Sequence, residues 1–114
     1  MKRAFDGRDF QLWEYRVSHG HALVRGPRRN PGEPNQDVIL AAVEYIGLPR
    51  HLPALALDDP SAAELATAAE LLGRPVAREH VHVFVAADRR YLTIAAQLVV
   101  RESDADIFDS PFED

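Results

Sequence analysis

Residues 79–100, EHVHVFVAADRRYLTIAAQLVV, hold two largely apolar runs on either side of a short polar centre. The two runs predict a β-hairpin, because alternate residues of a strand point to opposite faces of a sheet. A turn at Asp88–Arg89 pairs Val85 with Leu92, Val83 with Ile94 and Val81 with Ala96. We expect this wholly apolar face to cover a core and the mixed reverse face to be partly wet.

Two histidines, His80 and His82, fall on the reverse face of the expected hairpin. Residues i and i+2 of a strand point to the same side, so both imidazoles can reach one zinc or other divalent metal ion. Such a site needs a third ligand, which the sequence does not place. The alternative is that both rings lie on a half-exposed face and hydrogen-bond to Gln97 or to water.

A second hairpin is predicted over residues 9–26, DFQLWEYRVSHGHALVRG. With His19–Gly20 as a two-residue turn, Tyr15 faces Val24, and the apolar residues share one face. His19 and His21 repeat the spacing of the other histidine pair. The turn falls inside this pair, however, so the two side chains need not converge.

Residues 37–46, DVILAAVEYI, fit a helix face as well as a buried central strand. The β-branched residues and the Gly47-Leu48-Pro49 stop favour the strand. The PALALDD segment, residues 53–59, is either a short strand or an extended connection.

A helix is predicted over about residues 60–72 from its alanine content and its end signals. Asp59 can cap it with Pro60 at the first helical position, or Ser61 can cap it together with Glu64. Gly73 and Pro75 end it. The expected buried stripe is Leu65, Ala68, Ala69 and Leu72.

These elements predict an α+β fold: an antiparallel sheet of about four to six strands built from two hairpins, with the helix packed on one face. The length of 114 residues suits one domain, which we place at residues 1–101. Residues 102–114, ESDADIFDSPFED, form an acidic and aromatic tail that we expect to dock on the domain.

Composition narrows the classes of function. The chain has no cysteine, which removes disulfides and thiolate metal sites. Six of its eighteen acidic residues lie in the tail, which has no basic residue, so the first 101 residues carry a net charge of +1. Nucleic-acid binding normally shows a larger basic surplus, so we do not expect it.

The chain has no signal-like start and no long apolar run, so we expect a cytoplasmic protein without a membrane span.

Arginines and tail aromatics are the candidate interaction residues. Arg25, Arg28 and Arg29 lie in or beside the loop at residues 27–36, where guanidinium groups can bind carboxylates, RNA or the acidic tail. The tail carries Ile107, Phe108 and Phe112, which either close the protein's own sheet or insert into a partner. A small open sheet also has edges that a second copy can pair with, so a homodimer is a further expectation.

Three segments carry a resemblance: LWEYRVSHGHALVRGP at residues 12–27, VEYIGLP at 43–49 and IFDSPFED at 107–114. Together they resemble small hypothetical bacterial proteins with no assigned activity. The resemblance spans most of the chain and implies no catalytic residue.

The sequence favours a non-enzymatic protein-interaction module, in an inhibitory or immunity-like role. No serine stands in a nucleophile-elbow pattern and no glycine-rich phosphate loop is present, so we assign no catalytic residue. One alternative is a metal-binding protein or metal-dependent enzyme using His80 and His82. Another is small-molecule or RNA binding on the sheet face of His80, His82 and Phe84, which a concave pocket there would favour.

Overall fold

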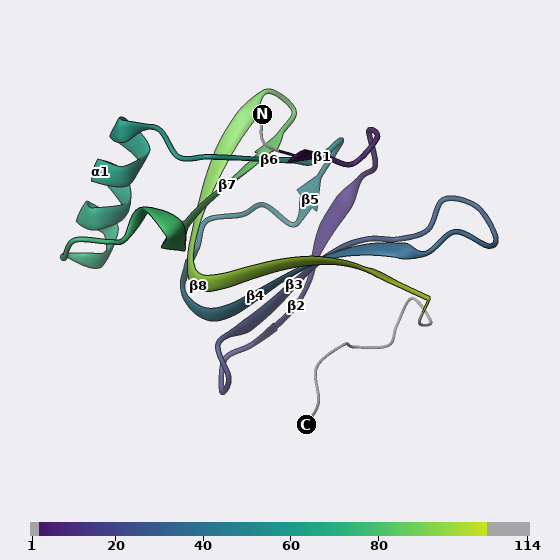
Figure 1. Cartoon of the computed structure of the whole chain (residues 1–114), viewed down its shortest axis with the longest axis horizontal. Helices are drawn as coiled ribbons and strands as arrows, with labels where there is room; N and C mark the ends of the chain where they lie inside the picture. The colour runs from purple at the N-terminus through teal and green to yellow at the C-terminus, as the bar shows by residue number, and fades with distance from the viewer. Residues whose placement is uncertain (1–2, 105–114) are drawn as a thin grey trace.

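The computed structural model describes residues 3–104, which form one bent antiparallel sheet with an α-helix at its end (Figure 1). The elements are β1 (Arg3–Ala4), β2 (Phe10–Arg16), β3 (His21–Gly26), β4 (Asn35–Ile46), β5 (His51–Leu52), β6 (Ala56–Asp58), α1 (Ala62–Leu72), the 3-10 helix η1 (Arg78–His80), β7 (Val81–Ala86) and β8 (Arg89–Ser103). The sheet order is β1-β6-β7-β8-β4-β3-β2-β5. The α+β class is confirmed, but the described sheet has eight strands rather than four to six. Three of the eight strands, β1, β5 and β6, are only two or three residues long, and β6 is the short strand that residues 53–59 offered as one alternative.

Strands β7 and β8 form the hairpin expected at residues 79–100, with a different register. Val83 pairs with Leu92 and Val81 with Ile94, so the turn lies at Ala87–Asp88. Both turn residues have positive φ angles, 50° and 60°. The pairing shifts by two residues from the prediction, and a shift of two keeps the same side chains together on each face. The expectation of a partly wet mixed face was wrong, because Phe84 and Ala95 of that face are buried in the larger apolar cluster, while Val81 and Ile94 of the apolar face pack in a smaller cluster against the helix.

Strands β2 and β3 also form the predicted hairpin, but their register differs from the predicted one. Tyr15 pairs with Ala22 rather than Val24, and the turn takes four residues, 17–20, instead of two. A bulge between Leu12 and Glu14 shifts the register further along. Trp13 occupies this bulge, which turns the side chains that follow to the other face.

Strand β4 confirms the strand interpretation of residues 37–46. It lies between β3 and β8, and its pairing with β8 extends from Asn35 opposite Ser103 to Ile46 opposite Thr93. Ala42 has a φ of 51°, and the register shifts just beyond it, between Val43 and Tyr45. β4 and β8 bend, so that β1, β5, β6 and β7 lie over one face of β8, β4, β3 and β2 (Figure 1).

The main core fills the space between these two parts of the sheet. Phe5 and Phe10 contact each other with ring centroids 4.9 Å apart. The buried members of this cluster are Phe5, Phe10, Ala22, Val24, Val38, Leu40, Leu52, Leu55, Leu57, Phe84, Ala86 and Ala95. Because Phe84 and Ala86 face this core, alternation places His82 on the same side of β7.

Helix α1 starts and ends as the sequence indicates. The Ser61 side chain accepts a hydrogen bond from the Glu64 amide, and the Glu64 side chain accepts one from the Ser61 amide, so the second capping arrangement is the one adopted. Gly73 ends the helix in the left-handed conformation. The helix buries Ala68 against Val81 and Ile94 in a smaller second cluster.

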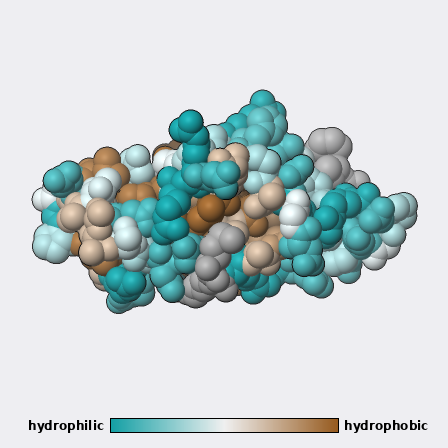
Figure 2. All heavy atoms as spheres, turned by 90° about the horizontal axis from the view of Figure 1, so that it is seen from above, coloured by the Kyte–Doolittle hydropathy of each residue, from teal (hydrophilic) through white to brown (hydrophobic). Residues whose placement is uncertain are grey.

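The surface is mostly hydrophilic, with hydrophobic atoms near the middle of the face in Figure 2 and at its left end, where α1 lies. Within the described residues the exposed large apolar side chains are Tyr15, Val17, Leu71 and Val99. No helix within residues 3–104 is both long and apolar enough to cross a membrane.

Candidate functional site

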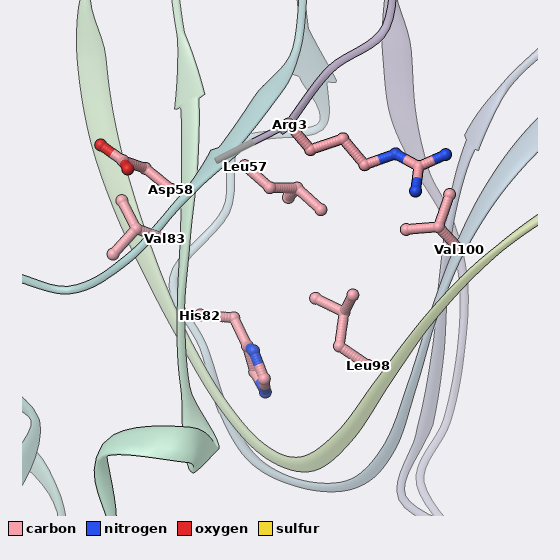
Figure 3. A pocket seen from close by; sticks show the side chains of 7 residues that line it. All are labelled: Arg3, Leu57, Asp58, His82, Val83, Leu98 and Val100. Carbon is pink, nitrogen blue, oxygen red and sulfur yellow. The ribbon is translucent and has the colours of Figure 1, made fainter. Parts of the chain in front are cut away.

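A pocket of about 290 Å³ opens on the core side of the sheet, where β1, β6 and β7 face the second half of β8 (Figure 3). Its lining residues are Arg3, Leu57, Asp58, His82, Val83, Leu98 and Val100. Leu57 belongs to the main core, and Leu98 and Val100 pack against it. The pocket therefore lies at the edge of the main core.

His82 reaches the pocket because it shares a face of β7 with Phe84. Its ring points towards Leu98 in Figure 3, and its Nε2 atom lies 3.0 Å from the carbonyl oxygen of Ala95. A carbonyl only accepts, so the imidazole donates, and this hydrogen bond holds a proton on Nε2. The side chain is partly buried and its orientation is fixed.

Arg3 is the other polar side chain that lies over the pocket. Its guanidinium group extends above Val100 in Figure 3, and its Cζ atom is 5.3 Å from the centre of the Phe5 ring. Arg3 is exposed. The pocket therefore combines an apolar floor, a fixed imidazole and an exposed cation at its margin.

Asp58 borders the pocket, but its carboxylate points away from it (Figure 3). Arg90 Nη1 donates to Asp58 Oδ2 at 2.7 Å, and Arg90 Nη2 donates to Glu64 Oε1 at 2.8 Å. These hydrogen bonds from Arg90 are the largest cause that lowers the pKa of both carboxyl groups. Arg90 therefore joins β8 to β6 and to the first turn of α1, and Asp58 is an anion with a structural partner.

The two predicted metal ligands lie in different elements. His80 is the last residue of η1, and His82 is the second residue of β7. The same-face rule for a continuous strand therefore does not apply to the pair. Within residues 3–104 no group of three or more His, Asp or Glu side chains is arranged to hold a metal ion. A metal at His80 and His82 stays a prediction.

His19 and His21 come together at the other hairpin. Their rings stack with centroids 5.9 Å apart and an angle of 25° between planes. Ser18 Oγ lies 2.9 Å from Nδ1 of His19, within hydrogen-bond distance. The longer turn explains the stacking, because it places His21 at the start of β3 and His19 beside it.

The three predicted interaction arginines have different surroundings. Arg25 has no exposed surface and pairs with Asp37. Arg28 Nη2 donates to the carbonyl oxygen of Asp104 at 3.0 Å, and Arg29 Nη1 donates to that of Asp6 at 3.2 Å. Arg28 and Arg29 are exposed. Ile107, Phe108 and Phe112, the predicted interaction residues of the tail, lie outside the described residues.

Sequence reasoning singled out His82 and missed the rest of the pocket. Arg3, Leu57 and Leu98 come from distant parts of the chain and meet only through pairing of β1 with β6 and of β7 with β8. Leu98 and Val100 were visible only as part of an apolar run. No spacing in the sequence marks these residues as neighbours.

Comparisons with protein-family models, with curated proteins and with solved structures find no match to the chain. The resemblance to small bacterial proteins of no assigned activity therefore stays a prediction.

Proposed function

We propose that the protein is a binding module whose pocket at His82 takes a small organic anion with a short apolar body. The proposal rests on the arrangement in Figure 3, where His82 and Arg3 border a floor of apolar side chains. Binding sites commonly combine an apolar lining with a few placed polar groups. The alternative of small-molecule binding on the face of His82 predicted such a pocket.

Size and charge support this ligand class. Ligand pockets span about 300 to 1,000 Å³, so a volume of about 290 Å³ suits a small molecule. Leu57, Leu98 and Val100 offer contacts to an apolar body, while the guanidinium of Arg3 attracts an anionic group. Phe84 takes no part, because it is fully buried in the core.

The same geometry favours binding over catalysis. A general acid or base must lie within hydrogen-bond reach of the group that gains or loses the proton. A neighbouring side chain must also hold it in that position. Here Nε2 of His82 is engaged with the Ala95 carbonyl, and the Asp58 carboxylate is turned towards Arg90. Neither group is paired with the other inside the pocket (Figure 3). A protein partner, a homodimer and a cytoplasmic location remain predictions alongside this proposal.

Backbone NMR titration with hexanoate, hexanol and hexylamine tests the proposal. We expect hexanoate to shift the amide signals of Leu57, His82 and Leu98 in a saturable way, with hexanol weaker and hexylamine inactive. Leu98→Phe should reduce the hexanoate shifts by filling the pocket. Leu71→Phe makes the same substitution on the exposed side of α1 and should leave them unchanged. Equal shifts with all three compounds, or none with hexanoate, would overturn the proposal.

A further inference from the structure

Strand β3 buries side chains on both of its faces. Ala22 and Val24 point into the main core, so alternation places Leu23 and Arg25 on the opposite side of the sheet. Leu23 and Arg25 have no exposed surface, and Leu23 belongs to neither core cluster. This opposite side of β3 is therefore buried too.

The opposite side continues across the sheet as two rows. The first row is Leu23 of β3, Ile39 of β4 and Val99 of β8. The second row is Arg25, Asp37 and Arg101. We call these six residues, with the Trp13 ring 5.9 Å from the guanidinium carbon of Arg25, the outer face. It joins an apolar row to a row with two cations and one anion.

The described elements leave the β8 side of the outer face exposed, whereas Leu23, Arg25 and Asp37 on β3 and β4 have no exposed surface. Helix α1 packs on Val81 of β7 and on Ile94, which precedes Val99 by five residues in β8. Within residues 3–104 no helix or strand is layered over the outer face (Figure 1). Val99, at the β8 end of the apolar row, retains 53% of its surface exposed.

The last described residues bring the chain to the edge of this face. β8 ends at Ser103 opposite Asn35, and Arg28 Nη2 donates to the carbonyl oxygen of Asp104. Residues 105–114 follow, and ten extended residues span at most about 33 to 36 Å. Crossing from β8 over β4 and β3 to β2 takes three strand spacings, about 15 Å. The remaining chain is therefore long enough to cross the whole outer face.

The chemistry of residues 105–114, ADIFDSPFED, complements the outer face. Ile107, Phe108 and Phe112 can bury against the apolar row, and the segment has four acids and no base. The acids match the exposed guanidinium group of Arg101, whereas that of Arg25 is buried and already paired with Asp37. We propose that residues 105–114 dock on the outer face of the same molecule. This proposal is independent of the pocket at His82.

A spin label on the tail tests the docking in the full chain. The protein has no cysteine, so Glu113→Cys gives a single labelling position. We expect the label to broaden the methyl NMR signals of Leu23, Ile39 and Val99. A label at Arg89→Cys, at the start of β8 beside the β7–β8 turn, should leave these signals sharp. Phe108→Ala combined with Phe112→Ala, added to the tail-labelled chain, should restore them.

Mixing the labelled chain with an isotope-labelled chain that has no spin label separates docking within one molecule from docking between two. Broadening only in the chain that carries the label supports the proposal. Broadening in the mixed sample would show that a second copy supplies the segment, which overturns it. Sharp outer-face signals in the tail-labelled chain would also overturn it, and would leave the face to a different protein partner.

Discussion

Arg25 and Asp37 form a two-point ion pair between neighbouring strands with no exposed surface on either side chain. Nε of Arg25 lies 2.8 Å from Oδ1 of Asp37, and Nη2 lies 3.1 Å from Oδ2. The two residues are direct cross-strand partners of β3 and β4. Burying two charges costs several kcal/mol each, and matched geometry of this kind offsets the cost. The pair therefore fixes how β3 meets β4.

Asp37→Asn should lower the free energy of unfolding by about 3 kcal/mol, because it removes the anion that offsets a buried guanidinium. Urea unfolding followed by circular dichroism measures the change. Glu44→Gln is the control, since Glu44 pairs with Arg74 at an exposed site and should matter by less than about 1 kcal/mol. Equal, small effects of the two substitutions would show that the buried pair contributes little.

The capping box at Ser61 gives a second prediction. Ser61→Ala removes the acceptor for the Glu64 amide and should lower the free energy of unfolding by about 1 kcal/mol. Thr67→Ala, at an exposed position inside the same helix, should be neutral or slightly stabilising because alanine is the better helix former. Thermal unfolding of both variants checks the difference. A loss at Thr67 that matches the loss at Ser61 would contradict a role specific to the cap.

The Arg90 cluster predicts a dependence of stability on acid pH. The ordinary pKa values of Asp58 and Glu64 are 3.8 and 4.5, and hydrogen bonds from Arg90 lower the pKa of both groups in the folded protein. Between the folded and unfolded pKa values the unfolded chain binds more protons, so stability rises with pH there. The contribution is present above the unfolded values and is lost as pH falls through the folded ones.

Arg90→Gln should therefore flatten the fall of the urea midpoint between about pH 5 and pH 3. It should also lower the midpoint at neutral pH. Arg74→Gln removes a guanidinium from an exposed pair with Glu44 and should keep the acid slope of the unchanged protein. Parallel slopes for the unchanged protein and Arg90→Gln would show that Arg90 does not set these two pKa values.

Most of the elements that the sequence predicts correctly follow from patterns within a few neighbouring residues. The capping pair Ser61 and Glu64, and the Gly73 stop, act within a few residues, so the helix followed from them. The two hairpins followed from apolar alternation, and β4 followed from its β-branched residues and the stop at residues 47–49. β1 and β5 have two residues each, which is too short for a period to show, and they pair with residues far along the chain. β6, with three residues, was one of two interpretations of residues 53–59.

The bulge of β4 and the turn after β7 share a conformational cause. Ala42 and Ala87 adopt positive φ angles, which sequence rules reserve for glycine and asparagine. Neither the bulge of β4 nor the turn after β7 therefore has a visible signal. The site was harder still, since His82 was recognisable as a histidine on a strand, whereas Arg3 and Leu98 become its neighbours only when the sheet bends.

The Ala87–Asp88 turn gives the last prediction. With both φ angles positive, 50° and 60°, the turn has the conformation that asparagine and glycine favour. A non-glycine residue there costs roughly 1 kcal/mol, so Ala87→Gly should raise the free energy of unfolding by somewhat less than that, and Ala87→Asn should raise it as well. Ala66→Gly is the matched control at an exposed position inside α1, where glycine should destabilise by about 0.5 to 1 kcal/mol. Urea unfolding compares the two glycine variants, and a loss of stability in both would place the turn at Asp88–Arg89 after all.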